Sequence, residues 1–215
     1  RQIERLAVQK LRESTEAKAI LEPLQEVVVE VMEAEGGIMT AVALQRELGR
    51  IGDGAHANVI KFFLSELLLG VVAPVGGENT TLVPGWRLRN ASLEVLEQML
   101  ARAQDIIMSR NVPWNEDELG RALVSAKLIN PLSEPLVNSH AAVALLELSQ
   151  NIKHNSFGEW GLAHWETVTP KRMNDKIYLV LKKHGTPLHF KELARLVNEQ
   201  GFDKKIAYPP TVHNE

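Results

Sequence analysis

Residues 57–88 read ANVIKFFLSELLLGVVAPVGGENTTLVPGWRL, and the spacing of the apolar positions changes halfway through this segment. In its first half the apolar side chains follow the helical spacing i, i+3, i+4, i+7 and i+8, at Ile60, Phe63, Leu64, Leu67 and Leu68. This spacing predicts a helix with one buried face. In its second half, residues 71–75 and 80–88 are rich in apolar and β-branched residues around the turn sequence Gly76-Gly77-Glu78-Asn79. The second half therefore predicts a β-hairpin, which would form a wing after the helix.

The residues before this segment predict the rest of a winged-helix unit over residues 22–90. A first helix is expected over residues 24–35, and Gly36-Gly37 ends it, as glycine often does at a helix C-terminus. Ile38-Met39 is expected to form a short strand, and Thr40 to cap a second helix over residues 41–48. Asp53 is the expected cap of the third helix.

The same order of elements recurs over residues 91–168. Ser92 is expected to cap a long first helix, and residues 112–114 to form a short strand. Asn115, with Glu118 three residues later, resembles a capping box at the start of the second helix. A third helix is expected from Pro135 or Leu136 to Leu148, and residues 152–165 are expected to form the second wing.

A third copy is expected over residues 169–215. Thr169-Pro170 predicts the start of its first helix, Gly185 the end of that helix, and residues 187–189 a short strand. The second helix is expected over residues 190–200, and Pro209-Pro210 opens a third helix with no wing after it. Residues 1–21 are expected to form one further helix and a linker. The predicted fold class is mainly α with short β-hairpins, arranged as tandem winged helix-turn-helix domains.

Composition and charge restrict the functions that this fold can carry. The chain has 215 residues and no cysteine, which excludes disulfides and thiolate metal sites. The longest apolar stretch, residues 67–74, is far too short to span a membrane. The net charge is −3, but residues 1–21 carry +2 and residues 169–215 carry +4, whereas residues 22–90 carry −4 and residues 91–168 carry −5. Because phosphates attract Lys and Arg, contact with DNA is expected at the two ends of the chain.

Two segments resemble known families. Residues 1–12, RQIERLAVQKLR, are similar to the end of region four of bacterial primary sigma factors, whose recognition helix typically closes with R-Q-I-E-x-x-A-L-x-K-L-R. The resemblance implies that Arg1 and Gln2 lie on the DNA side of a helix. Leu6 stands where that family often has Lys.

The second resemblance covers residues 169–215. The strings GTPLHFKEL, at residues 185–193, and TVHNE, at residues 211–215, resemble the HARE-type helix-turn-helix domain. That domain is a winged helix found in the delta subunit of bacterial RNA polymerase, in restriction-associated proteins and in chromatin proteins. Residues 157–165, FGEWGLAHW, resemble the end of such a wing. The pairing of both resemblances is typical of bacterial sigma-factor-like proteins, which implies a cytoplasmic, nucleoid-associated transcription protein.

A winged helix places its third helix in the major groove, while flanking cations meet phosphates. Thr and Asn side chains in the first turns of that helix suit contacts to bases. The expected DNA-binding residues are therefore Arg1, Gln2, Arg5, Lys171, Arg172, Lys176, Lys204, Lys205, Thr211, His213 and Asn214.

No motif in the sequence indicates catalysis, a metal site or a cofactor. None of the seven His residues has the helical spacing of a zinc hydrolase, and no phosphate loop or nucleophile elbow occurs. The expected partners are duplex DNA and the RNA polymerase core, with no membrane.

Two alternatives remain open. One is an adaptor that docks to RNA polymerase without touching DNA, because the middle of the chain is acidic. The other is the specificity module of a restriction or modification system. The sequence leaves the oligomeric state undetermined.

Overall fold

The computed structural model describes the backbone of residues 2–51, 56–77 and 80–215, and their side chains except those of residues 2–5 and 12. Contacts divide the chain into two compact units. Unit 1 consists of residues 1–103 and 120–150, and unit 2 of residues 104–119 and 151–215. The described residues form mainly helices with short antiparallel hairpins, which confirms the broad fold class. The predicted boundaries at 90/91 and 168/169 do not coincide with this division, and the three-unit organisation stays a prediction.

Two helices open unit 1, and the break between them lies earlier than expected. Helix α1 spans Gln2–Glu13 and α2 spans Thr15–Ala34. Ser14 separates them, because its Oγ accepts the N–H of Ala17 at 3.3 Å and caps α2. Because of this break, the expectation of one helix over residues 1–21 was wrong, and the helix expected over residues 24–35 begins earlier, at Thr15, and continues through Pro23. The prediction of a helix end at Gly36-Gly37 is confirmed, since both glycines have positive φ.

The next elements follow the predicted order. Strand β1 spans Ile38–Thr40, and Thr40 Oγ1 accepts the N–H of Ala43 at the start of α3, Ala41–Ile51. Helix α4, Ala57–Phe62, continues into the π-helical turn η1, Phe63–Leu67. The apolar stripe predicted for this segment buries Ile60, Leu64 and Leu68. The predicted cap at Asp53 lies outside the described residues.

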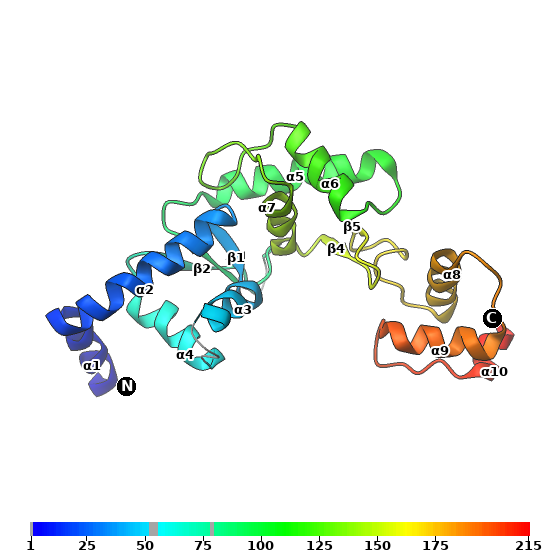
Figure 1. Ribbon diagram of the computed structural model, residues 1–215, viewed down its shortest axis with the longest axis horizontal. Helices are drawn as coiled ribbons and strands as arrows, with labels where there is room; N and C mark the ends of the chain where they lie inside the picture. The colour runs from blue at the N-terminus through cyan, green and yellow to red at the C-terminus, as the bar shows by residue number, and fades with distance from the viewer. Residues whose placement is uncertain (1, 52–55, 78–79) are drawn as a thin grey trace. The chain divides into compact units, whose positions relative to one another are not determined.

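A three-stranded antiparallel sheet with order β1-β3-β2 forms the centre of unit 1 (Figure 1). Strands β2, Val72–Val75, and β3, Gly85–Leu88, are the arms of the predicted first hairpin, which is confirmed. Trp86 of β3 lies opposite Pro74 of β2 and Met39 of β1. Proline is tolerated in β2 because this strand is an edge of the sheet. Helices α2 and α3 both contact β3.

Residues 120–150 complete unit 1. They begin within α6, Glu116–Ser125, whose first four residues belong to unit 2. They also contain two short helices, α7, Ser139–Ala144, and η2, Leu145–Leu148. Asn138 caps α7 by accepting the N–H of His140 at 2.8 Å. Turn η2 contacts β1, and Leu148 O accepts the N–H of Val83 at 2.9 Å. The predicted third helix over residues 135–148 is therefore shorter, because it begins only after Asn138.

Helix α5, Leu93–Arg110, contributes its first part to unit 1 and its last turns to unit 2. Ser92 Oγ accepts the N–H of Val95 at 3.3 Å, as predicted. The expected strand over residues 112–114 is only an isolated bridge between Trp114 and Trp160. No helix among the described residues is both long enough and apolar enough to cross a membrane.

Residues 151–215 of unit 2 contain a second hairpin followed by three helices. Strands β4, Ile152–His154, and β5, Trp160–Leu162, confirm the predicted second ribbon. Helix α8 spans Met173–His184, α9 spans Phe190–Gln200 and α10 spans Pro209–Asn214. Helix α8 begins later than Thr169-Pro170 predicted, because the Asp175 carboxylate accepts the N–H groups of Lys171 and Arg172. Residues 187–189 are not a strand, and His189 instead caps α9.

Candidate nucleic-acid interface

Helices α8, α9 and α10 form the scaffold of the candidate interface (Figure 1). Helix α9 contacts both α8 and α10, around a core of Val180, Leu193, Ala194, Val197, Ala207 and Val212. The Asn198 side chain of α9 forms two hydrogen bonds to the backbone of Ala207. Its Nδ2 donates to the Ala207 carbonyl at 2.9 Å, and its Oδ1 accepts the Ala207 N–H at 2.7 Å. These bonds fix the segment that leads into α10.

Helix α10 buries one side chain and exposes the polar ones that the sequence singled out. Val212 is buried in the core, whereas Thr211, His213 and Asn214 are exposed. The His213 ring packs against Phe190 with a centroid separation of 5.0 Å. His213 therefore also supports the contact between α10 and the start of α9. Thr211 and Asn214 supply the hydroxyl and carboxamide groups that could reach base edges.

Lysine side chains gather in the loop before α10. Lys204 and Lys205 are exposed, and both line a pocket of about 260 Å³ together with residues of α8 and α9. No ion pair joins either lysine to another residue in the described part of the chain. The Asp203 carboxylate attracts Lys205 electrostatically but also pairs with Lys176, so these two adjacent cations exceed the nearby negative charge and can attract a phosphate backbone.

The start of α8 contributes two more exposed cations. Lys171 and Arg172 precede the first turn of the helix. Arg172 Nη2 lies 3.0 Å from Glu166 Oε1, but both side chains are more than half exposed. Such a solvated pair is weak and can exchange its carboxylate for a phosphate.

Lys176 is a correction to the predicted site. Its side chain is only 2% exposed, and its Nζ lies 2.7 Å from Asp203 Oδ1. The reason is its position in α8, three and four residues before the buried Leu179 and Val180, which places it on the inner face of the helix. A lysine held inside the unit by a carboxylate cannot also meet a phosphate. Sequence reasoning missed this pair, although the spacing to Leu179 and Val180 was visible.

Arg195 does not add to the positive surface either. In α9 it forms ion pairs with Glu192 and Glu199, one turn away on each side. Its hydrogen bond to Glu192 raises the pKa of Arg195 and lowers the pKa of the Glu192 carboxyl. Its charge is therefore balanced within the helix. Arg1, Gln2 and Arg5, the predicted DNA contacts at the other end of the chain, have side chains that lie outside the described residues.

The Lys176–Asp203 pair makes the stability of unit 2 depend on pH. A hydrogen bond from Lys176 and another from the Lys205 N–H hold the pKa of Asp203 below its ordinary value. Because folding lowers this pKa, the stabilisation is complete above about pH 4 and is lost as the pH falls through the lower folded value. We expect Asp203→Asn to lower the melting temperature of unit 2 at neutral pH by several degrees, since it leaves the buried Lys176 charge unpaired.

Thermal unfolding followed by circular dichroism at several pH values measures this effect. The difference between Asp203→Asn and the original chain should shrink on acidification. The control is Glu166→Gln, which removes the exposed pair with Arg172 and should change the melting temperature little. Equal melting temperatures for all three proteins at neutral pH would contradict the structural role of the pair.

No group of three or more His, Asp or Glu side chains among the described residues is placed to hold a metal ion. Comparison of the chain with protein-family models, with curated proteins and with solved structures finds no match.

Proposed function

We propose that this chain is a DNA-associated, sigma-factor-like transcription protein that binds duplex DNA, RNA polymerase or both through winged-helix units. The observation that carries the proposal is the arrangement around α10. Lys204 and Lys205 are exposed just before this helix, and Thr211 and Asn214 are exposed on it. Cations beside a short polar helix suit phosphate contact together with entry into the major groove.

The order of elements in residues 22–90 supports the winged-helix part of the proposal. Helix α2 is followed by β1, then α3, then α4 with η1, and finally the β2–β3 hairpin. Strand β1 pairs with the second arm of that hairpin. A helix, a short strand, two helices and a hairpin are the parts of a winged helix. In residues 169–215 the order α8, α9, α10 corresponds to the three helices of such a unit.

The two family resemblances support a role in transcription. Residues 1–12 resemble the end of sigma region four, and the described part of this segment, residues 2–12, lies within the helix α1. Residues 185–193 and 211–215 carry the strings that resemble the HARE-type domain. Both families include proteins that act with bacterial RNA polymerase.

Titration of the full chain into fluorescently labelled duplex DNA at low salt tests DNA binding. We expect a saturable increase in fluorescence anisotropy, with unlabelled duplex competing. No change in anisotropy at any protein concentration would contradict DNA binding.

A second candidate function, an adaptor that docks to polymerase, is favoured by the acidic surface of α2. Glu22, Glu26, Glu30 and Glu33 are all exposed and recur every three or four residues along this helix. We expect Glu26→Lys together with Glu30→Lys to reduce capture of core RNA polymerase by roughly tenfold, because rim charges steer association. The readout is the amount of core polymerase retained on immobilised chain.

The control for that experiment is Glu94→Lys together with Glu97→Lys. Both residues are exposed on α5, so the pair carries the same change of charge at another place in the chain. Equal retention by both double variants would contradict docking through α2.

A further inference from the structure

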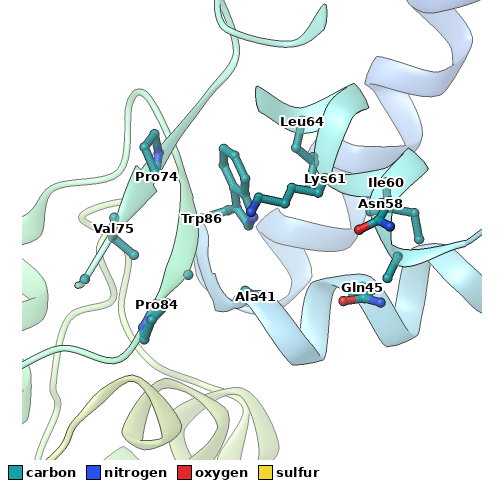
Figure 2. Close-up of a pocket in the computed structure, with 13 residues that line it drawn as sticks. Ala41, Gln45, Asn58, Ile60, Lys61, Leu64, Pro74, Val75, Pro84 and Trp86 are labelled. Carbon is teal, nitrogen blue, oxygen red and sulfur yellow. The ribbon is translucent and has the colours of Figure 1, made fainter. Parts of the chain in front are cut away.

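Unit 1 contains a pocket between the helices and the hairpin of the first predicted winged-helix segment (Figure 2). Its volume is about 420 Å³, and it is lined by residues of α3, of α4 with η1, and of β2 and β3. This volume falls in the range of small-molecule sites, roughly 300–1,000 Å³. All of the lining residues belong to unit 1, and none belongs to the candidate interface around α10.

The walls of the pocket are mainly apolar and include one large aromatic ring. Trp86 is half-buried and lies opposite Pro74 in the sheet, while Pro84 comes just before β3. Ile60 and Leu64 of the apolar stripe, both buried, line the helical side. The indole ring presents a flat apolar face that favours contact with a planar ring, and the two proline rings add apolar C–H surface beside it.

Three polar side chains reach the same pocket from the helices. Gln45 of α3 and Asn58 and Lys61 of α4 are exposed, and in Figure 2 the Lys61 side chain extends from α4 toward Trp86. None of the three has a hydrogen bond or an ion pair to another residue in the part of the chain that the structure describes. Among the described residues that line the pocket, Lys61 is the one charged residue.

We propose that this pocket binds a small planar aromatic carboxylate. Its ring would lie against Trp86 between Pro74 and Pro84, and its carboxylate would meet the Lys61 ammonium. Gln45 and Asn58 would donate amide N–H groups to the same carboxylate or to a ring substituent.

The apolar and charged groups of the pocket favour an aromatic carboxylate over a wholly apolar ligand and over a polyphosphate. A wholly apolar ligand would cover Lys61 without giving its charge a partner, which costs free energy. A polyphosphate or a nucleic-acid strand needs several cations, and the described lining of this pocket offers one. In an aromatic carboxylate, the flat ring can contact the apolar walls while the single anionic group pairs with the Lys61 ammonium.

Titration of the full chain with naphthoate and with naphthalenemethanol, its neutral relative of the same shape, tests the proposal. The readout is the NMR resonance of the Trp86 indole N–H, assigned with Trp86→Phe. We expect naphthoate to shift this resonance with a Kd of about 1 mM or tighter, an ordinary affinity for a ligand of its size. Naphthalenemethanol should bind more weakly.

Lys61→Met should weaken naphthoate binding by about tenfold and leave naphthalenemethanol unchanged, because methionine keeps the length of the side chain without its charge. Lys18→Met, which removes an exposed lysine from α2, should leave both affinities unchanged. The proposal is overturned if Trp86 does not respond to naphthoate, if the neutral ligand binds equally well, or if Lys61→Met has no effect. Tighter binding of a short oligothymidylate with the same dependence on Lys61 would also overturn it, in favour of a nucleic-acid strand.

Discussion

Replacing Lys204 and Lys205 with glutamate is expected to weaken binding of the full chain to duplex DNA by about 100-fold at low salt. Both lysines are exposed in the loop that leads to α10, which begins at Pro209, and neither forms an ion pair with another described residue. Each phosphate contact that is lost removes the release of a counterion, and each added carboxylate repels the backbone. The loss should be similar for all DNA sequences, because phosphate contacts carry no base information. Fluorescence anisotropy with two unrelated duplexes measures it.

The control is the double variant Lys127→Glu with Lys153→Glu. It changes the net charge by the same amount, and both lysines are exposed outside the candidate interface. We expect at most a few-fold weakening from the general change in charge. Equal weakening by the two double variants would contradict an interface around α10. It would show that DNA binding depends only on the net charge of the chain.

Replacing Gly85 with alanine is expected to lower the free energy of unfolding of unit 1 by about 2–3 kcal/mol. A Cβ at this position would lie 2.4 Å from the carbonyl oxygen of Met39 in β1, and 3.2 Å from Val75 Cγ2. Because β3 is the middle strand, relief of this overlap must displace β1 or β3 and break their pairing. Urea unfolding followed at the indole resonance of Trp86, the neighbouring residue in β3, measures the change.

The matched control is Gly49→Ala. Gly49 lies in α3, and a Cβ there would meet nothing within 4 Å. Alanine is a better helix former than glycine, so this change should stabilise the unit by up to about 1 kcal/mol. If Gly85→Ala also left stability unchanged or raised it, the close β1–β3 pairing would be contradicted.

Patterns within one segment predicted most of the elements. The stripe from Ile60 to Leu68 predicted α4 and η1, because helical spacing of apolar residues needs no knowledge of distant residues. Both hairpins were indicated by apolar residues at alternating positions on either side of a glycine-containing turn. The bounds of α9 follow from Phe190 and Gly201, since a glycine with positive φ ends the helix.

Contacts between distant segments were not predictable in the same way. The break at Ser14 was not predicted: the helix expected over residues 24–35 begins at Thr15, and α2 continues through Pro23. Lys176 was taken for a surface cation because its partner, Asp203, lies 27 residues further along the chain. The pocket beside Trp86 combines side chains from α3, α4 and the hairpin, so no single motif indicated it.

The dependence of duplex binding on salt tests the proposed DNA interface most directly. If Lys171, Arg172, Lys204 and Lys205 each neutralise one phosphate, the logarithm of the association constant should fall against the logarithm of the salt concentration with a slope of about −3.6. Replacing Lys204 and Lys205 with glutamine should bring that slope to about −1.8. A slope near zero for the original chain, or one that these replacements leave unchanged, would contradict binding of DNA through this surface.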